Sequence, residues 1–352
     1  MMHSVSNAAA DESTTTSPSD AAAAGLVREI APELTTINDW SHSGVAVLRD
    51  GRVVVSTPGS GHVSVIDADG GVATFECGSG IYHGIAVDPD HPSRVWFADI
   101  GVEPEQAGLY VCDIDARELR DVAPAARGVA PVLGWRPTDV AVERGFEDPE
   151  GWVAWVADGY GRSLVHRVER GAITLTLDGS VSGLAFDCPH GIALDTRGAE
   201  TLVVVADRAN QRLVWWTLGG DFVRELRHPL ITSPSSIAVR GQHLVVTELF
   251  GSVIAVDPAD RVADIVTRST RTRDGAWPNA GAEASPERPP LEPGQVNSPH
   301  GIAATSNGVV ITEWIFGGRT LRLADELLAR ARFTPAEPAD DTPQENETRE
   351  LS

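Results

Sequence analysis

The chain has 352 residues, of which 42% are hydrophobic and 22% are charged, and its formal net charge at pH 7 is −22. A strongly acidic chain is a poor match for the phosphates of nucleic acid or for an anionic membrane surface, so we expect neither as a partner. No stretch approaches the roughly 20 apolar residues that span a bilayer. Three widely separated cysteines (Cys77, Cys112 and Cys188) do not suggest a disulfide framework. We therefore expect a cytoplasmic protein and a monomer.

The two ends of the chain differ in composition from the middle. Residues 1–25 are rich in Ser, Thr, Ala and Asp and lack the basic region and apolar run of a secretory signal, so we expect a disordered N-terminal arm. Residues 334–352 are acidic and contain Pro, which predicts a disordered acidic tail. The folded part is predicted to be one domain over residues 26–333.

One phrase recurs six times along this domain: a small or polar residue, then Ile or Val, then Ala, then usually another aliphatic residue. Its copies are 40 to 65 residues apart, and each is followed by a turn and a second β-rich run. The copies begin at Ser43, His83, Thr138, His190, Ser235 and His300. Short strands with Gly, Asp and Asn turns, repeated at this period, are typical of propeller blades. The sequence predicts an all-β fold, a six-bladed β-propeller.

Three further segments complete this prediction. The apolar stretch 26–33 precedes the first blade, and the sixth blade lacks an outer strand, so we expect this stretch to pair with the last blade and close the ring. The Pro-rich insert 268–296 is either a binding element or a disordered surface loop. Residues 323–332 have helical periodicity and predict a short terminal helix.

Histidine begins the second, fourth and sixth copies (His83, His190 and His300) and no odd-numbered copy. The innermost strand of each blade lines the channel of a propeller, so equivalent positions form a ring about its axis. Alternate blades of six are about 120° apart, and three inward imidazoles match a metal site with an open fourth position. We expect Zn²⁺ first, ahead of Fe²⁺, Ni²⁺ or Co²⁺. The alternative for each histidine is a hydrogen-bonded turn residue.

Four motifs occur in order between residues 137 and 216: PTDVAVE, VADGYGRSLV, CPHGIALD and VADRANQRLVWW. Together with the three HG strands they resemble the catalytic core of peptidyl-α-hydroxyglycine α-amidating lyase (peptidylamidoglycolate lyase), within the NHL-repeat β-propellers. The resemblance covers about residues 44–323.

The resemblance implies a reaction and the residues that perform it. The family cleaves a carbinolamide C–N bond to give a peptide amide and glyoxylate, and its three zinc-binding histidines match His83, His190 and His300. Its catalytic tyrosine matches Tyr160, and an active-site arginine matches Arg208. The metal would acidify the α-hydroxyl, Tyr160 would accept or relay its proton, and Arg208 would hold the carboxylate. The alternatives are a tyrosine packed on its blade and an arginine paired with a neighbouring carboxylate.

The sequence departs from the family at three places. The family has a second arginine at the end of the second strand of its first blade, but residues 53–61 contain no basic residue. The acid that binds calcium after the third histidine is Gly301 here, so we expect weak Ca²⁺ binding or none. The cysteine that follows the tyrosine in secreted members is Gly161, in agreement with a reducing compartment.

Carboxylates recur at the ends of the second strands. We expect most of them to be structural, and some of them to orient the histidines as hydrogen-bond acceptors. They are Asp99, Asp158, Asp207, Glu248 and Glu313. Cys188 is either a buried cysteine or a thiolate ligand.

Three functions remain open on the sequence. The leading one is a metal-dependent lyase that binds a peptide or another small hydroxylated substrate at the mouth of the central channel. The second is a non-catalytic NHL-repeat scaffold that binds a protein or peptide. The third is a lactonase-type propeller, which usually holds its metal with acids and Asn and so fits three histidines poorly.

Overall fold

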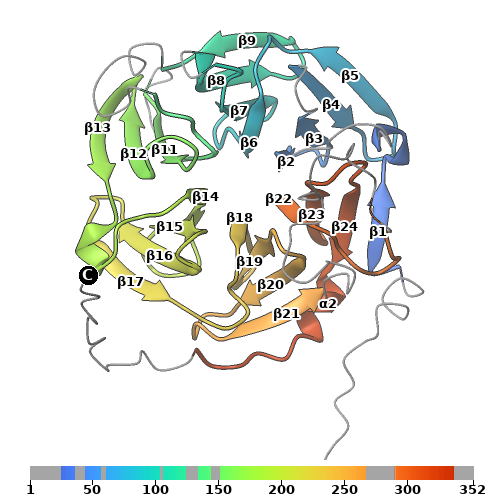
Figure 1. Cartoon of the computed structure of the whole chain (residues 1–352). Coiled ribbons are helices and arrows are strands. Elements are labelled where there is room, and N and C mark those ends of the chain that lie inside the picture. The colour runs from blue at the N-terminus through green and yellow to red at the C-terminus, as the bar shows by residue number, and fades with distance from the viewer. Residues whose placement is uncertain are drawn as a thin grey trace, which may run out of the picture.

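The computed structural model describes residues 25–35, 44–56, 61–103, 106–123, 134–143, 151–266, 289 and 291–336. Within them, six four-stranded antiparallel sheets surround a common axis (Figure 1). The predicted six-bladed β-propeller is therefore confirmed. The arm 1–25, the tail 334–352 and the insert 268–296 lie largely outside the described residues.

Each blade runs outward from an inner strand that faces the axis. The first three blades are β2 (Val45–Val47), β3 (Val53–Ser56), β4 (His62–Ile66), β5 (Val72–Glu76); β6 (Tyr82–Val87), β7 (Arg94–Asp99), β8 (Gly108–Asp113), β9 (Glu118–Asp121); and β10 (Asp139–Val142), β11 (Val153–Asp158), β12 (Leu164–Glu169), β13 (Ala172–Leu177). Blades 4 to 6 are β14 (Pro189–Asp195), β15 (Leu202–Asp207), β16 (Arg212–Thr217), β17 (Phe222–Leu226); β18 (Pro234–Arg240), β19 (His243–Glu248), β20 (Ser252–Val256), β21 (Val262–Val266); and β22 (Pro299–Thr305), β23 (Gly308–Glu313), β24 (Thr320–Ala324), β1 (Val27–Ile30).

The core lies between consecutive blades. Trp155 of β11 and Trp216 of β16 belong to one buried cluster that joins blades 3 and 4, and comparable clusters lie at the other seams. The middle strands are buried on both faces, so they have nearly continuous apolar runs such as Val203–Ala206 instead of clean alternation. Packing on both faces fixes the orientation of each inner strand toward the axis.

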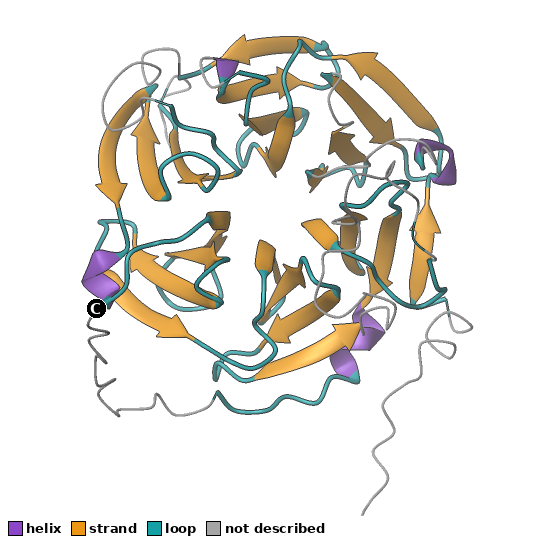
Figure 2. Cartoon of the chain, in the orientation of Figure 1, coloured by secondary structure: helices purple, strands orange, loops and turns teal. Residues whose placement is uncertain are grey.

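The N-terminal segment closes the ring. Strand β1 pairs antiparallel with β24, with Val27 opposite Leu323 and Ile30 opposite Thr320, as the sequence predicts. The predicted terminal helix is α2 (Asp325–Ala329), and its Leu327 is buried in the same cluster as Val27. Figure 2 shows the short helical segments at the outer edge of the ring. Among the described residues, no helix has the length and apolar character needed to cross a bilayer.

The pairing of β1 with β24 predicts that Val27 stabilises the whole ring. Val27→Ala removes buried apolar volume at the closure, so we expect the free energy of unfolding in urea to fall by about 2 kcal/mol. Arg28→Ala, one residue along the same strand but exposed, is the matched control and should change it by less than about 0.5 kcal/mol. Equal effects of the two substitutions would contradict a closure that depends on burial.

Candidate metal centre

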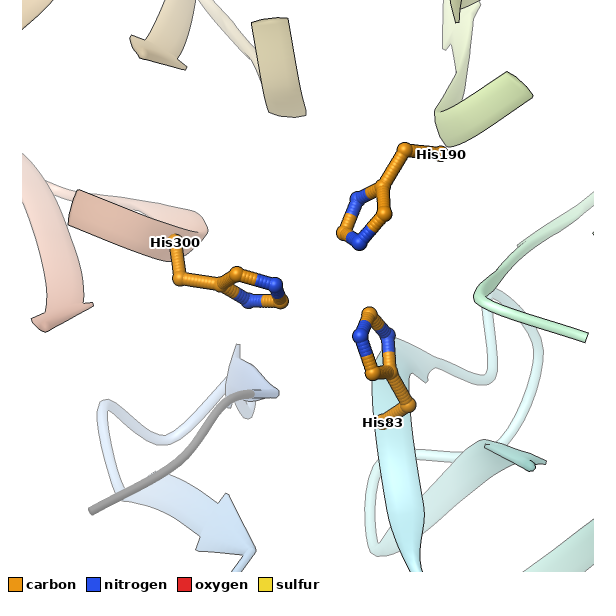
Figure 3. Close-up of side chains that lie close together, drawn as sticks. All are labelled: His83, His190 and His300. Atoms are coloured by element: carbon orange, nitrogen blue, oxygen red, sulfur yellow. The ribbon is translucent and has the colours of Figure 1, made fainter. Parts of the chain in front are cut away.

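Three buried histidines converge on the axis of the ring (Figure 3). His83, His190 and His300 are each the second residue of an inner strand, in β6, β14 and β22. Their ring centroids are 4.7–4.8 Å apart, and one nitrogen from each lies within 4.8 Å of the others. The structure thus brings together the three residues that the repeat register places on alternate blades. Of their odd-blade counterparts, Ser43 lies outside the described residues.

The neighbouring blade orients two of these rings. His83 Nδ1 lies 2.6 Å from the carbonyl oxygen of Thr138, and His190 Nδ1 lies 2.8 Å from that of Ser235. A carbonyl oxygen only accepts, so Nδ1 carries the proton and donates it. Nε2 is left with its lone pair, on the side of the ring that faces the axis (Figure 3). At these two positions blades 3 and 5 supply the acceptors, and blades 2 and 4 supply the imidazoles.

This contact also explains the glycine that follows His83 and the glycine that follows His190. A Cβ on Gly84 would lie 2.6 Å from the Thr138 carbonyl oxygen, and a Cβ on Gly191 would lie 2.4 Å from the Ser235 carbonyl oxygen. Any larger residue would push the two inner strands apart. The two residues of the HG pair therefore act together. The glycine allows the inner strand of the next blade to come close, and the histidine donates a hydrogen bond to a carbonyl of that strand.

Burial keeps the His83 and His190 imidazoles neutral. Loss of solvation lowers the pKa of His83 to about 3, opposed by the Thr138 carbonyl and reinforced by the Arg208 charge. The pKa of His190 also lies well below its ordinary value, chiefly through burial and then through Arg208. Neutral imidazole is the form that binds a metal. A tetrahedral Zn²⁺ with Zn–N bonds of about 2.0–2.1 Å separates its nitrogens by roughly 3.4 Å, so a small inward shift of the rings would complete such a site.

Tyr160 lies at the histidines. It belongs to the turn between β11 and β12, and its hydroxyl oxygen lies 3.1 Å from His190 Nε2 and 3.3 Å from His83 Nε2. Its side chain is therefore part of the site and does not simply pack on its own blade. Burial raises the pKa of Tyr160 above its usual value, against the opposing charge of Arg208. In this environment the residue is a phenol that can donate a proton.

Arg208 lies on the next turn of the same face, between β15 and β16. Its Nη2 donates to the Ser235 hydroxyl over 2.9 Å, and its buried Nε has no hydrogen-bond partner among the described residues. Arg208 forms no ion pair with a carboxylate in the described part of the chain, so the alternative of an arginine paired with a neighbouring acid is not what the structure shows. The guanidinium still has donors that a ligand carboxylate could occupy.

The carboxylates at the second-strand ends are structural. Each accepts a backbone N–H from the loop that enters its own blade, over 2.6–2.9 Å. The pairs are Asp99 with Ile81, Asp158 with Arg136, Asp207 with Asp187, Glu248 with Thr232, and Glu313 with Asn297. The expectation that some of these acids orient the histidines is wrong for His83 and His190, whose acceptors are main-chain carbonyls.

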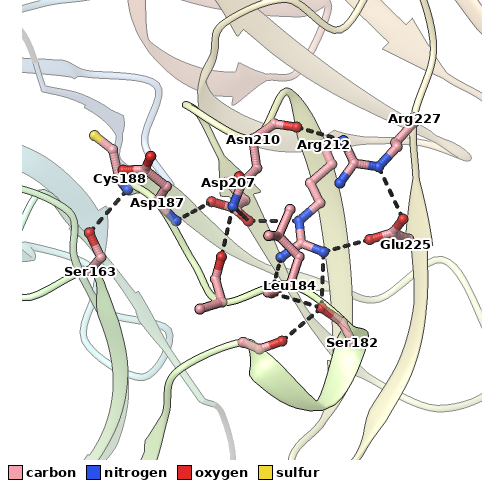
Figure 4. Close-up of polar contacts among 12 residues, drawn as sticks. Ser163, Ser182, Leu184, Asp187, Cys188, Asp207, Asn210, Arg212, Glu225 and Arg227 are labelled. Carbon is pink, nitrogen blue, oxygen red and sulfur yellow. Dashed lines mark hydrogen bonds and ion pairs between the residues drawn. The ribbon is translucent and has the colours of Figure 1, made fainter. Parts of the chain in front are cut away.

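In blade 4 this anchoring extends into a buried ion-pair network (Figure 4). Arg212 contacts Asp207 over 2.7 Å and Glu225 over 2.6 Å, and it donates to the Ser182 hydroxyl and the Leu184 carbonyl. Ser182 and Leu184 belong to the loop that leads to His190. Removing the Arg212 guanidinium would leave the buried Asp207 carboxylate without its counter-charge and would release Ser182 and Leu184, so the network holds this loop in one position.

Cys188 enters the same loop without joining the metal centre. Its backbone N–H donates to the Ser163 hydroxyl over 3.2 Å, and its φ of 55° turns the chain toward His190 (Figure 4). Burial raises the pKa of its thiol, which disfavours a thiolate. The cluster that could hold a metal ion among the described residues consists of the three histidines alone.

Sequence reasoning missed two residues near the axis. The Trp314 ring lies 5.9 Å from the His300 ring, and Asp139 lines the channel of about 300 Å³ along the inner strands. Burial raises the pKa of Asp139 to about 7, and its oxygens accept the N–H groups of Val140 and Ile192. The signal for Asp139 was its register: the residue after the ring position is Gly or Ser in every other blade.

Comparisons with known proteins identify the fold of the chain but do not assign it to a family. No protein-family model matches the chain, and no curated protein matches its sequence. Similar solved structures include streptogramin B lyase (TM-score 0.55, 14% identity, covering 84% of this chain and 97% of that chain). A catalytically inactive histidine-to-alanine variant of virginiamycin B lyase from Staphylococcus aureus, with quinupristin, has a TM-score of 0.53 and 14% identity over 85% of this chain and 98% of that chain.

A third similar structure is a protein of unknown function from Bacteroides thetaiotaomicron. Its TM-score is 0.60 at 15% identity, covering 85% of this chain and 75% of that chain. At such identities the likeness shows the propeller fold, and it includes lyases among the proteins that share it.

The geometry predicts a stoichiometric transition-metal site. We expect the purified chain, incubated with Zn²⁺ and desalted, to retain about one zinc per chain by elemental analysis, and His190→Ala to lose most of it because two nitrogens hold the ion poorly. His91→Ala is the control, because it removes a histidine whose ring contacts Asp88 at the opposite face. A wild-type chain that retains no metal would rule the site out.

The lowered pKa values predict an unusual pH dependence. Three histidines with ordinary pKa values near 6.5 would lose roughly 600-fold in zinc affinity between pH 7 and pH 5.5, because protons would compete at each ring. His83 titrates only near pH 3 and His190 well below its usual range. We therefore expect a loss of no more than about tenfold, measured by competition with a chelator calibrated at each pH. A loss of several hundredfold would contradict the burial argument.

Proposed function

We propose that the chain is a zinc-dependent carbon–nitrogen lyase whose substrate is a peptidyl-α-hydroxyglycine or a closely related α-hydroxylated amide. One observation carries the proposal: three buried imidazoles converge beside a phenol that is within hydrogen-bond distance of two of them. A protein-binding scaffold needs no such cluster on its axis. The lyases among the similar structures support an enzymatic role.

The three Nε2 atoms are the groups that would hold the ion, since Nδ1 of His83 and of His190 is committed to a carbonyl. Zn²⁺ bound there would polarise the substrate hydroxyl and lower its pKa. The protein's own contribution is to present these donors with little rearrangement, because the neighbouring blades already orient the rings of His83 and His190.

Arg208 would bind the substrate carboxylate. Its Nε and the remaining guanidinium donors can form a paired hydrogen bond with the two carboxylate oxygens. The Ser235 hydroxyl holds Nη2 and so fixes the plane of the guanidinium. With no arginine in residues 53–61, this single cation would anchor the glyoxylate end of the substrate.

Tyr160 would move the proton. As the C–N bond breaks, the hydroxyl oxygen forms the aldehyde of glyoxylate and gives up its proton, while the leaving amide nitrogen takes one. The Tyr160 phenol can donate to that nitrogen and then regain the hydroxyl proton, so no net proton is consumed. Because its pKa is raised, the phenol keeps its proton until the leaving amide nitrogen accepts it as the C–N bond breaks. This favours the relay role over that of a standing base.

A cytoplasmic setting belongs to the same proposal. The three cysteines are free thiols in the structure, which is compatible with a reducing compartment.

The test is glyoxylate release from an α-hydroxyglycine peptide by the zinc-loaded chain. We expect turnover by the wild type, a fall in kcat of about 10²–10⁴-fold in Tyr160→Phe, and a rise in KM of about 100-fold in Arg208→Gln. Arg162→Gln, an exposed arginine on the same face in the Tyr160 turn, is the matched control.

The outcomes separate the candidate functions. A zinc-loaded chain that releases no glyoxylate from any of several such peptides would overturn the proposed reaction. A chain that holds no metal and binds peptides equally well with and without Tyr160 would point to the scaffold.

A further inference from the structure

Three side chains occupy equivalent positions beside the three histidines. Each directly follows the carboxylate at the end of a second strand in a histidine-bearing blade. Its backbone N–H donates to the carbonyl of the residue two before the histidine, over 2.8–3.2 Å. These residues are Ile100 beside His83, Arg208 beside His190, and Trp314 beside His300. The same backbone geometry therefore delivers an aliphatic, a cationic and an aromatic group to the same end of the channel.

The face is chemically divided as a result. Blades 3 and 4 contribute Tyr160 and Arg208, whereas blades 5 and 6, neighbours in Figure 1, contribute Phe250 and Trp314. Phe250 lies in the turn between β19 and β20 and is 43% exposed, and Trp314 is half-buried with its ring 5.9 Å from that of His300. Aromatic rings left in water at the edge of a site gain free energy when an apolar ligand group covers them.

We propose that Trp314 and Phe250 form an apolar subsite, the aromatic wall, which binds the N-acyl side of the substrate. This inference rests on the proposed function for the position of the carboxylate. A ligand whose carboxylate is held by Arg208 of blade 4, and whose next carbon lies over the histidines, must direct its acyl group away from blade 4. The aromatic wall on blades 5 and 6 offers an apolar surface on that side, so the ligand class is an N-acylglycine unit with a bulky apolar acyl group.

Unreactive ligands test recognition separately from catalysis. N-acetylglycine and N-benzoylglycine share the carboxylate and amide but lack the α-hydroxyl, so neither can be cleaved. By calorimetric titration of the zinc-loaded full chain, we expect the benzoyl compound to bind about tenfold more tightly, through burial of roughly 55 Å² of additional apolar surface.

Substitutions at Trp314 test whether the preference for the benzoyl compound comes from the aromatic wall. Trp314→Leu should reduce the tenfold ratio to less than about threefold, and Trp314→Phe, which keeps a ring, should retain most of it. Trp152→Leu is the matched control: Trp152 is also half-buried, but it precedes β11 at the opposite face and packs on Trp96. Zinc content, measured for each variant, shows that a lost preference is not a lost metal site.

Arg208→Gln separates this inference from the proposed function. It should weaken both ligands alike and leave their ratio unchanged. If the ratio follows Trp314 but no glyoxylate is ever released, the aromatic wall stands and the reaction fails. A wild-type ratio near one, or equal ratios in Trp314→Leu and Trp152→Leu, would overturn the aromatic wall whatever the activity.

Discussion

The contact on which this site depends is the one between an imidazole Nδ1 and the main-chain carbonyl of the next blade. It requires two inner strands to approach so closely that only glycine fits at positions 84 and 191. In return it fixes the tautomer and the direction of the ring without any charged residue. A carboxylate in that place would raise the basicity of the ring and add negative charge to the channel. A carbonyl leaves the histidines neutral and the centre open to a cation.

The fold and the ligand set follow from residue order, because a repeated phrase sets the register of each inner strand and the register decides what faces the axis. The six copies therefore predicted the blades, the closure by residues 26–33 and the meeting of His83, His190 and His300. The partners of the histidines were less accessible to sequence reasoning. Every residue has a main-chain carbonyl, so a sequence does not show which carbonyl accepts a hydrogen bond from a histidine. The acids at the strand ends were therefore the candidate acceptors, but they bind the backbone of the entry loops.

Trp314 was missed for a different reason. The residue after each second-strand carboxylate varies from blade to blade, so its position alone did not single out Trp314. The backbone hydrogen bonds show that Ile100, Arg208 and Trp314 are held in the same way beside the histidine strands. Different positions within a blade thus have different roles. The start of the inner strand carries the candidate metal ligands, the carboxylate binds the backbone of the entry loop, and the turn just beyond the carboxylate carries the side chains that differ between blades. Proteins that share the ring can diverge at these turns without disturbing the frame.

The hydrogen bonds between histidines and the carbonyls of neighbouring blades also have a consequence for how the blades hold together. The smallest piece that contains one oriented imidazole is a pair of adjacent blades, yet no pair binds an ion, since each supplies a single nitrogen. An ion at the centre would act as a hub that joins blades 2, 4 and 6, the last of which includes the N-terminal strand β1. Separation of neighbouring blades would move one histidine away from the ion, so the amount of bound metal would report whether the whole ring is closed.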